Sequence, residues 1–482
     1  MYRISDRNQE DILEEYFKPF GGMLNLKNRW IEMMKIMHWD FIEEIYAEHF
    51  KNDIAYGRVP ISARVAYGAI FIKEFQNLTD RRTVEFIAEN PYAQNFLGYT
   101  SFEKDNLFDP SMMSILRKRF SASIVNDVND EIHRRSIREQ TPPGDGGNSG
   151  ELILDATVVP TDIRYPNEVS LLDESRENVE KAIQECWDQI SKHNGHMLPY
   201  NKQRAHAHYL AFAKCKRRSK GKIYKARRKK LNYVVLALAR LRELVLEEGV
   251  ELRNFWVSRL VVIEEIVRQQ QEMQDERKTT VENRIVNVRQ PLVRPIKRDK
   301  ARNPTEFGQK ITFSVVNGFT FIGKQSFDNF NEGKKLIECV EEYYDRFGFY
   351  PEAVIADQIY RTRENRAYCK GHGIRLTGPP LGRKKKDSED SEREQAYADS
   401  CDRNTVESRN GIAKRRFGLE LIMCWSKENA LTEAAHNVMA MNVAHLLRLL
   451  FCHYSKIRHF SHLLQLELRL FDSEYEYIGI AI

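Results

Sequence analysis

The chain has 482 residues, 42% of them apolar, and a formal net charge of only +6. This length allows two or three domains with a sizeable core, and the composition suits a folded, soluble protein. No stretch of about 20 apolar residues predicts a membrane span, and the acidic N-terminal segment lacks the order of a signal peptide. Seven scattered cysteines without a CxxC pair argue against a disulfide framework and a cysteine-rich zinc site. We therefore expect a cytoplasmic protein.

Residues 1–138 are predicted to form a helical N-terminal domain. A helical apolar spacing follows Pro60, and Asp109-Pro110 is a typical start for a later helix. That helix ends in the basic residues Arg117, Lys118 and Arg119. A small helical bundle with a basic last helix is a common DNA-binding shape, although a purely structural domain is an equal alternative at this point. Residues 139–150 are rich in Gly and Pro and predict a linker.

A first strand is predicted after the linker, within the segment 151–166, and a long, mainly helical insertion follows over residues 167–290. Between Lys214 and Lys230 this insertion carries eleven Lys or Arg and no acid. Only Ile223 and Tyr224 interrupt the charges at the centre, so we expect an exposed segment that is not part of a core. The segment either contacts phosphates or is a solvated arm without a fixed partner.

Strand patterns resume within residues 291–450. Two apolar runs flank Asn317-Gly318, which is a strong signal for a two-residue hairpin. A helix, a strand over 353–356, and another strand over 374–377 follow. This order is that of an RNase H-like α/β core, in which strand one is central and the strand that precedes Asp357 lies beside it.

After these strands, within the core range 291–450, residues 384–392 are highly charged and predict a mobile segment. The next stretch contains Glu407 and is helix-like. Apolar residues from Leu431 to Leu450 follow helical spacing; packing against the sheet is the first interpretation and a dimer contact the second. Residues 451–482 predict a C-terminal helical tail.

Three acidic residues occupy positions where a nucleic-acid enzyme needs them. Asp155 and Asp357 end apolar, strand-like runs, and Glu407 lies on a predicted helix. Each Asp alone is more often a turn or cap residue, but the three together can converge. Carboxylate oxygens are the ligands that Mg²⁺ or Mn²⁺ prefers. A pair of such ions about 4 Å apart can activate a nucleophile and stabilise the leaving oxygen of a phosphodiester.

The residues around the acids carry a family resemblance. The stretch Arg403-x3-Glu407-x6-Lys414 is similar to the Tyr-x2-Arg-x3-Glu-x6-Lys signature of DDE transposases of bacterial insertion sequences, in the insertion sequence four and five superfamily. Ser400 stands at the Tyr position, which puts a Tyr contact to DNA in doubt. The resemblance covers about residues 55–450.

This resemblance implies a DDE transposase that cuts DNA at insertion-sequence ends and transfers the strand into target DNA. It implies Asp155, Asp357 and Glu407 as catalytic, metal-binding residues with two Mg²⁺ or Mn²⁺ ions, terminal inverted repeats and target DNA as partners, a homodimer in the synaptic complex, and association with the bacterial nucleoid. Together with the basic clusters, it predicts DNA contacts by Arg403, Lys414, Arg415, Arg117, Lys118, Arg119, Arg217, Arg218, Arg227 and Arg228.

Two other functions stay open. An RNase H-like nuclease would use the same triad, because hydrolysis and strand transfer are both in-line displacements at phosphorus. A DNA-binding regulator derived from a transposase would have no need of all three carboxylates. Arg403, Lys414 and the helical N-terminal region favour transposition.

Overall fold

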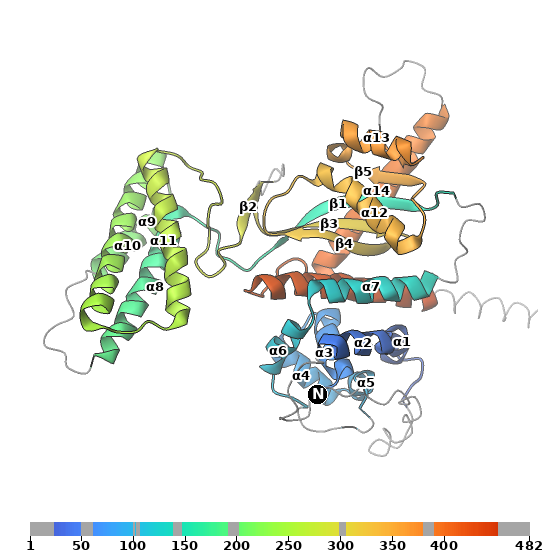
Figure 1. Cartoon of the computed structure of the whole chain (residues 1–482), viewed down its shortest axis with the longest axis horizontal. Coiled ribbons are helices and arrows are strands. Elements are labelled where there is room, and N and C mark those ends of the chain that lie inside the picture. Colours follow the sequence, from blue (N-terminus) through green and yellow to red (C-terminus); the bar gives the residue numbers. More distant parts are fainter. Residues whose placement is uncertain are drawn as a thin grey trace, which may run out of the picture.

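The computed structural model describes residues 24–49, 61–99, 102, 107–137, 147–190, 202–297, 305–378 and 390–451. Its N-terminal part is helical, as predicted (Figure 1). Polar side chains fix several helix starts: the Asn28, Ser62 and Thr79 side chains each accept a backbone N–H of the first turn. The helices of this part are α1 (Arg29–Ile36), α2 (Trp39–His49), α3 (Ala63–Gln76), α4 (Asp80–Glu89), α5 (Pro91–Phe96), α6 (Met112–Arg119) and α7 (Ala122–Ile137).

A mixed six-stranded sheet forms the second part of the protein. Strand β1 is central; it pairs antiparallel with β3 on one side and parallel with β5 on the other. β6 extends the sheet beyond β5, while β2 and β4 both pair with the far edge of β3. The strands are β1 (Glu151–Pro160), β2 (Arg294–Lys297), β3 (Thr305–Val316), β4 (Phe319–Ser326), β5 (Ala353–Ala356) and β6 (Arg375–Leu376).

The predicted hairpin is present between β3 and β4. Asn317 and Gly318 both have positive φ, 50° and 79°, as a two-residue primed turn requires. Asn tolerates this region better than most residues and Gly enters it without strain. The turn therefore sets the register of the β3–β4 pair, in which Val316 lies opposite Phe319.

Helices and short 3₁₀ turns cover the sheet (Figure 1). They are η3 (Glu332–Lys335), α12 (Leu336–Phe347), η4 (Gln358–Tyr360), α13 (Arg363–Gly371), α14 (Asp390–Arg416) and a further helix over residues 427–451. α12 ends where predicted, at Gly348, which has a φ of 81°. Residues 390–392, expected in a mobile segment, already belong to α14.

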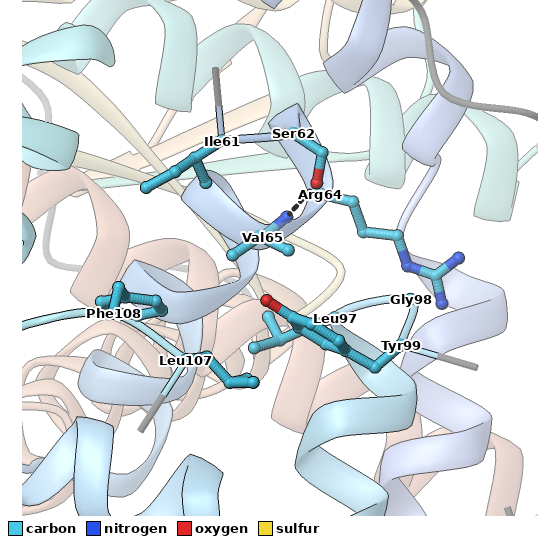
Figure 2. Close-up of a pocket in the computed structure, with 9 residues that line it drawn as sticks. All are labelled: Ile61, Ser62, Arg64, Val65, Leu97, Gly98, Tyr99, Leu107 and Phe108. Carbon is cyan, nitrogen blue, oxygen red and sulfur yellow. Dashed lines mark hydrogen bonds between the residues drawn. The ribbon is translucent and has the colours of Figure 1, made fainter. Parts of the chain in front are cut away.

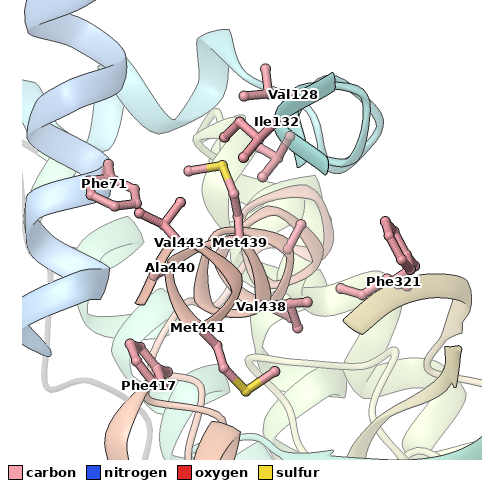
Figure 3. Close-up of a cluster of buried hydrophobic side chains, with 14 of the residues drawn as sticks. Phe71, Val128, Ile132, Phe321, Phe417, Val438, Met439, Ala440, Met441 and Val443 are labelled. Atoms are coloured by element: carbon pink, nitrogen blue, oxygen red, sulfur yellow. The ribbon is translucent and has the colours of Figure 1, made fainter. Parts of the chain in front are cut away.

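One hydrophobic core joins the N-terminal helices to the sheet. The helix 427–451 lies at its centre: Val438, Met439 and Val443 sit between Phe71 of α3 and Phe321 of β4 (Figure 3). Polar contacts cross the same junction, since Asn442 Nδ2 donates to Asn129 Oδ1 of α7 at 2.8 Å and to the Thr320 carbonyl of β4 at 2.7 Å. The apolar stripe of this helix is therefore core, which was its first interpretation.

The insertion between β1 and β2 has its own core and stands beside the sheet (Figure 1). Its helices are α8 (Glu168–Gln189), α9 (Lys202–Ala213), α10 (Lys220–Glu248) and α11 (Asn254–Asp275). Buried apolar residues on α8, α10 and α11 face one another, among them Val179, Leu241 and Ile263. Because these helices have their own core, they can follow β1 without disturbing the pairing of β1 with β3 and β5.

The sequence missed β2 and α9. β2 is four residues long and contains Pro295, so neither alternation nor strand composition marks it. α9 mixes polar and apolar residues around its circumference, and of its residues only Ala205 is buried. The predicted tail, apart from residue 451, lies outside the described residues, as does most of the linker. Within the described ranges, every helix is too short or too polar to cross a bilayer.

Candidate active site on the neighbouring strands β1 and β5

Two of the three predicted carboxylates lie on neighbouring strands. β1 and β5 pair in parallel, with Leu154 opposite Ala356. The next residues are Asp155 of β1 and Asp357, which directly follows β5, so the register brings the two aspartates side by side. They also share a face of the sheet with Ile153 and Ile355, because side chains two residues apart in a strand point the same way. This adjacency of the two strands was predicted from the order of elements.

Helix α14 covers that face. Val406 of α14 is 1% exposed and packs with Ile153 of β1, Val315 of β3 and Ile355 of β5 in a small apolar cluster. Ile153 and Ile355 each precede an aspartate by two positions. The cluster therefore holds α14 over the sheet close to Asp155 and Asp357. Glu407 directly follows Val406, so this packing brings the third carboxylate over the same two strands.

A stripe of residues along α14 lies against β1 and the two aspartates. Its residues, Arg403, Glu407, Asn410 and Lys414, are spaced by four, three and four positions, which places them on one side of a helix. Asn410 Nδ2 donates a hydrogen bond of 2.7 Å to Asp155 Oδ2. Lys414 Nζ donates to the Val158 carbonyl of β1 at 2.9 Å. We refer to these four residues as the α14 stripe.

Arg403 lies between two of the carboxylates. Its guanidinium is 3.6 Å from Asp357 Oδ1 and 3.6 Å from Glu407 Oε1. The side chains of Asp357 and Glu407 are 58% and 60% exposed, whereas Asp155 is half-buried. Exposed ion pairs contribute little to stability, so Arg403 can leave these carboxylates at small cost.

The buried phenol of Tyr360 is close to both aspartates. Burial is the main reason that its pKa lies far above the usual value, and the negative charges of Glu332, Asp155 and Asp357 add to the effect. Asp357 also caps the short helix η4, since its Oδ1 accepts the Gln358 N–H at 2.6 Å. Asp357 therefore caps a helix, as is common for a single Asp after a strand, and also lies beside Asp155.

The three acids offer carboxylate oxygens to a hard divalent ion. They do not form the tight group that binds an ion directly: among the described residues, the group with all ligand atoms within 4.8 Å is Asp173, Glu177 and His206 in the insertion. Asp173 there accepts from Lys230 Nζ at 2.5 Å and Arg176 Nε at 3.0 Å. The buried acid of that group, Asp173, is therefore already paired in an ion-pair network, while Glu177 and His206 are exposed.

Most of the residues predicted to bind DNA are accessible. Lys414 is half-buried against β1, and Arg119, also half-buried, donates to the Tyr46 hydroxyl. Arg218 is exposed but donates to the Ala213 carbonyl at 2.9 Å. The other exposed residues are Lys118, Arg217, Arg228, Arg403 and Arg415.

Two of the predicted DNA contacts are wrong. Arg117 is buried, and its two terminal nitrogens each donate to a carboxylate oxygen of Asp80 at 2.7 Å. Arg227 is also buried and donates to Gln274 Oε1, Glu168 Oε2 and the Met273 carbonyl at 2.8–3.0 Å. Neither guanidinium is available to a phosphate, because its donors are used inside the protein.

The basic run is not an exposed segment throughout. Its second half begins α10 at Lys220, and Arg227 and Lys230 are 4% and 1% exposed. The expectation that the run contributes nothing to a core failed because acids supplied by α8, Glu168 and Asp173, lie opposite these cations. These ion pairs could not be predicted from the sequence, because the acids lie more than 50 positions before the cations.

Asn410 was not predicted as a site residue. It lies three positions after Glu407 and seven after Arg403, so helical spacing alone would have placed it beside them. The pocket of about 280 Å³ in the N-terminal helices involves none of the predicted catalytic residues. It is lined by residues of α3 and of the segments around α5 and α6, including Arg64, Tyr99 and Phe108, and Ser62 Oγ accepts the Val65 N–H at its rim (Figure 2).

Comparison with known proteins gives two family matches. Residues 354–446, which include Asp357 and α14, match the family described as "Transposase DDE domain". Residues 19–119 match the family described as "Transposase domain (DUF772)". An uncharacterized protein of Rhizobium meliloti, ORF8 in the nfe locus, is 24% identical over 152 residues, which are 31% of this chain and 70% of that protein. No solved structure matches the chain.

A mixed sheet with acidic residues side by side on two neighbouring strands, covered by a helix with a third acid, is consistent with a DNA-processing enzyme of the transposase class. The two family matches indicate a DDE transposase of an insertion sequence.

Proposed function

We propose that this protein cleaves DNA at the ends of its insertion sequence and joins the released end to target DNA, as a member of the insertion sequence four and five superfamily. Asp155, Asp357 and Glu407 are its catalytic residues. The observation that carries the proposal is the parallel β1–β5 register, which puts Asp155 beside Asp357 under the helix that bears Glu407.

The catalytic core is RNase H-like in this proposal. The sheet order β4–β3–β1–β5–β6 supports it, because it has a central first strand, a hairpin on one side and two parallel strands on the other. Asp155 within β1 and Asp357 just after β5 lie beside each other because these two parallel strands are adjacent. Residues 167–290 are then an insertion into this core, and residues 1–138 a helical part that binds transposon ends.

The three carboxylates fit one or two Mg²⁺ or Mn²⁺ ions by the chemistry of their donor atoms, which are all oxygen. When bound, such ions supply activation of a water or 3′-hydroxyl and stabilisation of the leaving oxygen. The protein supplies the placement: β1 and β5 hold two acids, and α14 holds the third. Arg403 keeps Asp357 and Glu407 from repelling each other until ions take over that function.

The positive side chains around the acids bind the DNA backbone in this proposal. Arg403, Lys414 and Arg415 all lie on α14, on or next to the side that carries Glu407. A guanidinium released from its carboxylates can form two parallel hydrogen bonds to a phosphate. These residues position the DNA and carry no base information. The protein acts in the cytoplasm on nucleoid DNA, as a homodimer that holds both transposon ends.

Substitution of Asp357 tests the catalytic assignment. Asp357→Ala removes one of the acids but no buried contact, because Asp357 is exposed. We expect cleavage of a labelled transposon-end duplex with Mg²⁺ to be lost, while binding of the same duplex in a gel-shift assay is retained. A variant that still cleaves transposon ends would rule out the assignment. Glu364→Ala, an exposed acid of α13, is the matched control and should cleave normally.

The product of the wild-type reaction distinguishes transposition from hydrolysis. A transposase joins the 3′ end to a target plasmid, whereas an RNase H-like nuclease leaves free ends only. We therefore expect labelled end DNA to appear in plasmid-sized products when Mg²⁺ and target DNA are both present. Cleavage without any joined product would favour the nuclease.

A further inference from the structure

Asn410 links α14 directly to the first catalytic strand. Its Nδ2 lies 2.7 Å from Asp155 Oδ2, across 255 positions of sequence. An ionised carboxylate only accepts hydrogen bonds, so the amide must present its N–H₂ group to Asp155. A short bond from an amide donor to a charged acceptor is stronger and more directional than one between neutral groups.

The orientation of this amide leaves its other end without a partner. Asn410 Oδ1 is buried and accepts no hydrogen bond within the described part of the chain. A buried acceptor without a donor costs free energy. The unpaired oxygen therefore destabilises the folded protein, so stability alone does not explain an asparagine at this position. Its hydrogen bond to Asp155 does.

The neighbours of Asn410 explain why a fixed orientation matters. Arg403, on the same helix, contacts the other two acids, Asp357 and Glu407. Asn410 brings a hydrogen-bond donor of the same stripe to the first acid, Asp155. An ion shared by acids from a strand and a helix requires each carboxylate to keep a set direction, and partners that fix ligand direction strongly affect metal affinity.

We infer that Asn410 is a positioning residue that orients the Asp155 carboxylate for divalent-ion binding. This inference rests on the proposed function, because it assumes that Asp155 is a metal ligand. Asn410 itself is not a catalytic residue: it acts through Asp155 and adds no acid or base. Its removal should weaken ion binding while leaving the fold and the DNA contacts in place.

The test is Mn²⁺ binding to the full-length protein without DNA, measured by electron paramagnetic resonance of free Mn²⁺. Asn410→Ala should raise the dissociation constant by about 10-fold or more, in line with losses on removing residues that orient metal ligands. Asn410→Gln retains a carboxamide donor and should recover part of the affinity. Asn404→Ala, the same change at an exposed asparagine of the same helix, is the control and should bind as wild type.

Ala is the best helix former, so Asn410→Ala should not disturb α14, and circular dichroism would verify this. DNA binding at fixed salt should be unchanged in all three variants. Wild-type Mn²⁺ affinity in Asn410→Ala would overturn the inference, as would a loss that Asn410→Gln does not relieve at all. Asp155→Asn tests the metal site separately from the role of Asn410. If this variant also binds Mn²⁺ with wild-type affinity, Asp155 is not a metal ligand and the proposed metal site is wrong.

Discussion

The guanidinium of Arg117 is held inside the protein by a carboxylate. Burial by itself would lower the pKa of Arg117, but the hydrogen bonds and charge of Asp80 raise it instead, so the group stays charged. Asp80 begins α4 and Arg117 lies in the last turn of α6, so the pair ties these two helices together. The basic end of α6 therefore includes one residue that stabilises the bundle and one, Lys118, that faces solvent.

Replacing Arg117 should affect stability more than DNA binding. Arg117→Ala leaves the partly exposed Asp80 without its partner, and we expect unfolding free energy to fall by about 2 kcal/mol, less than for a fully buried pair. Urea unfolding would measure this. Lys118→Ala should be within about 0.5 kcal/mol of wild type, as for ordinary surface changes. Loss of DNA affinity in Arg117→Ala at unchanged stability would contradict this account.

Helix α10 divides its positive charges between two sides. Arg227 and Lys230, three positions apart, face the acids Glu168 and Asp173 of α8 and are buried. Arg228, next to Arg227, is exposed, and Arg217 and Arg218 precede the helix on the surface. Exposed cations without nearby acids attract polyanions, so the exposed half of the run is the part suited to phosphates.

This division predicts opposite effects for neighbouring arginines. Changing Arg217, Arg218 and Arg228 together to Ala should weaken binding of unrelated DNA sequences alike and reduce the salt slope of binding by up to about 3, since each lost phosphate contact removes about 0.9. Arg227→Ala should instead lower the melting temperature. Fluorescence anisotropy across a salt series would measure the first effect. A triple variant with wild-type affinity at every salt concentration would exclude a role in DNA binding.

At the scale of the whole molecule, the N-terminal helices and the sheet share buried histidines as well as apolar residues. His133 of α7 packs edge-on against Phe319, Phe321 and Phe347, with ring centroids 4.7–5.4 Å apart. His436 lies beside Tyr67 of α3. Burial lowers the pKa of each imidazole to about 3, so both are neutral in the folded protein.

These histidines predict a loss of stability in acid. The unfolded chain binds protons at His133 and His436 near pH 6.5, whereas the folded protein does not until about pH 3, so stability falls as pH falls between these values. Each histidine should contribute a slope of about 1.4 kcal/mol per pH unit. Urea unfolding at pH 7, 6 and 5 would measure it.

His133→Phe keeps an aromatic ring among its aromatic neighbours. It should reduce the slope of unfolding free energy against pH by the contribution of one histidine. Asn404→Ala, an exposed substitution that removes no titratable group, is the control and should keep the wild-type slope. An identical slope in His133→Phe and wild type would show that this imidazole is not kept neutral by the fold.

Local sequence determined most of the elements, though not β2 or α9, and it named the candidate acids. Asn317-Gly318 specified a hairpin because its backbone preference is intrinsic, and the apolar runs before Asp155 and Asp357 specified strands because alternation and strand composition are local. The helical stripe in residues 427–451 likewise indicated a buried helix. These features depend on residues within a few positions of one another, which a single sequence contains.

Tertiary structure decided which charges are buried and which groups orient the acids. Arg117 and Arg227 look like the exposed cations beside them until Asp80 and Glu168 are brought opposite. Asn410 contacts Asp155 only because α14 packs across β1 in the folded protein. The energy of a charge or polar group depends on its partner and burial, and partners 37 to 255 positions away are set only by the fold.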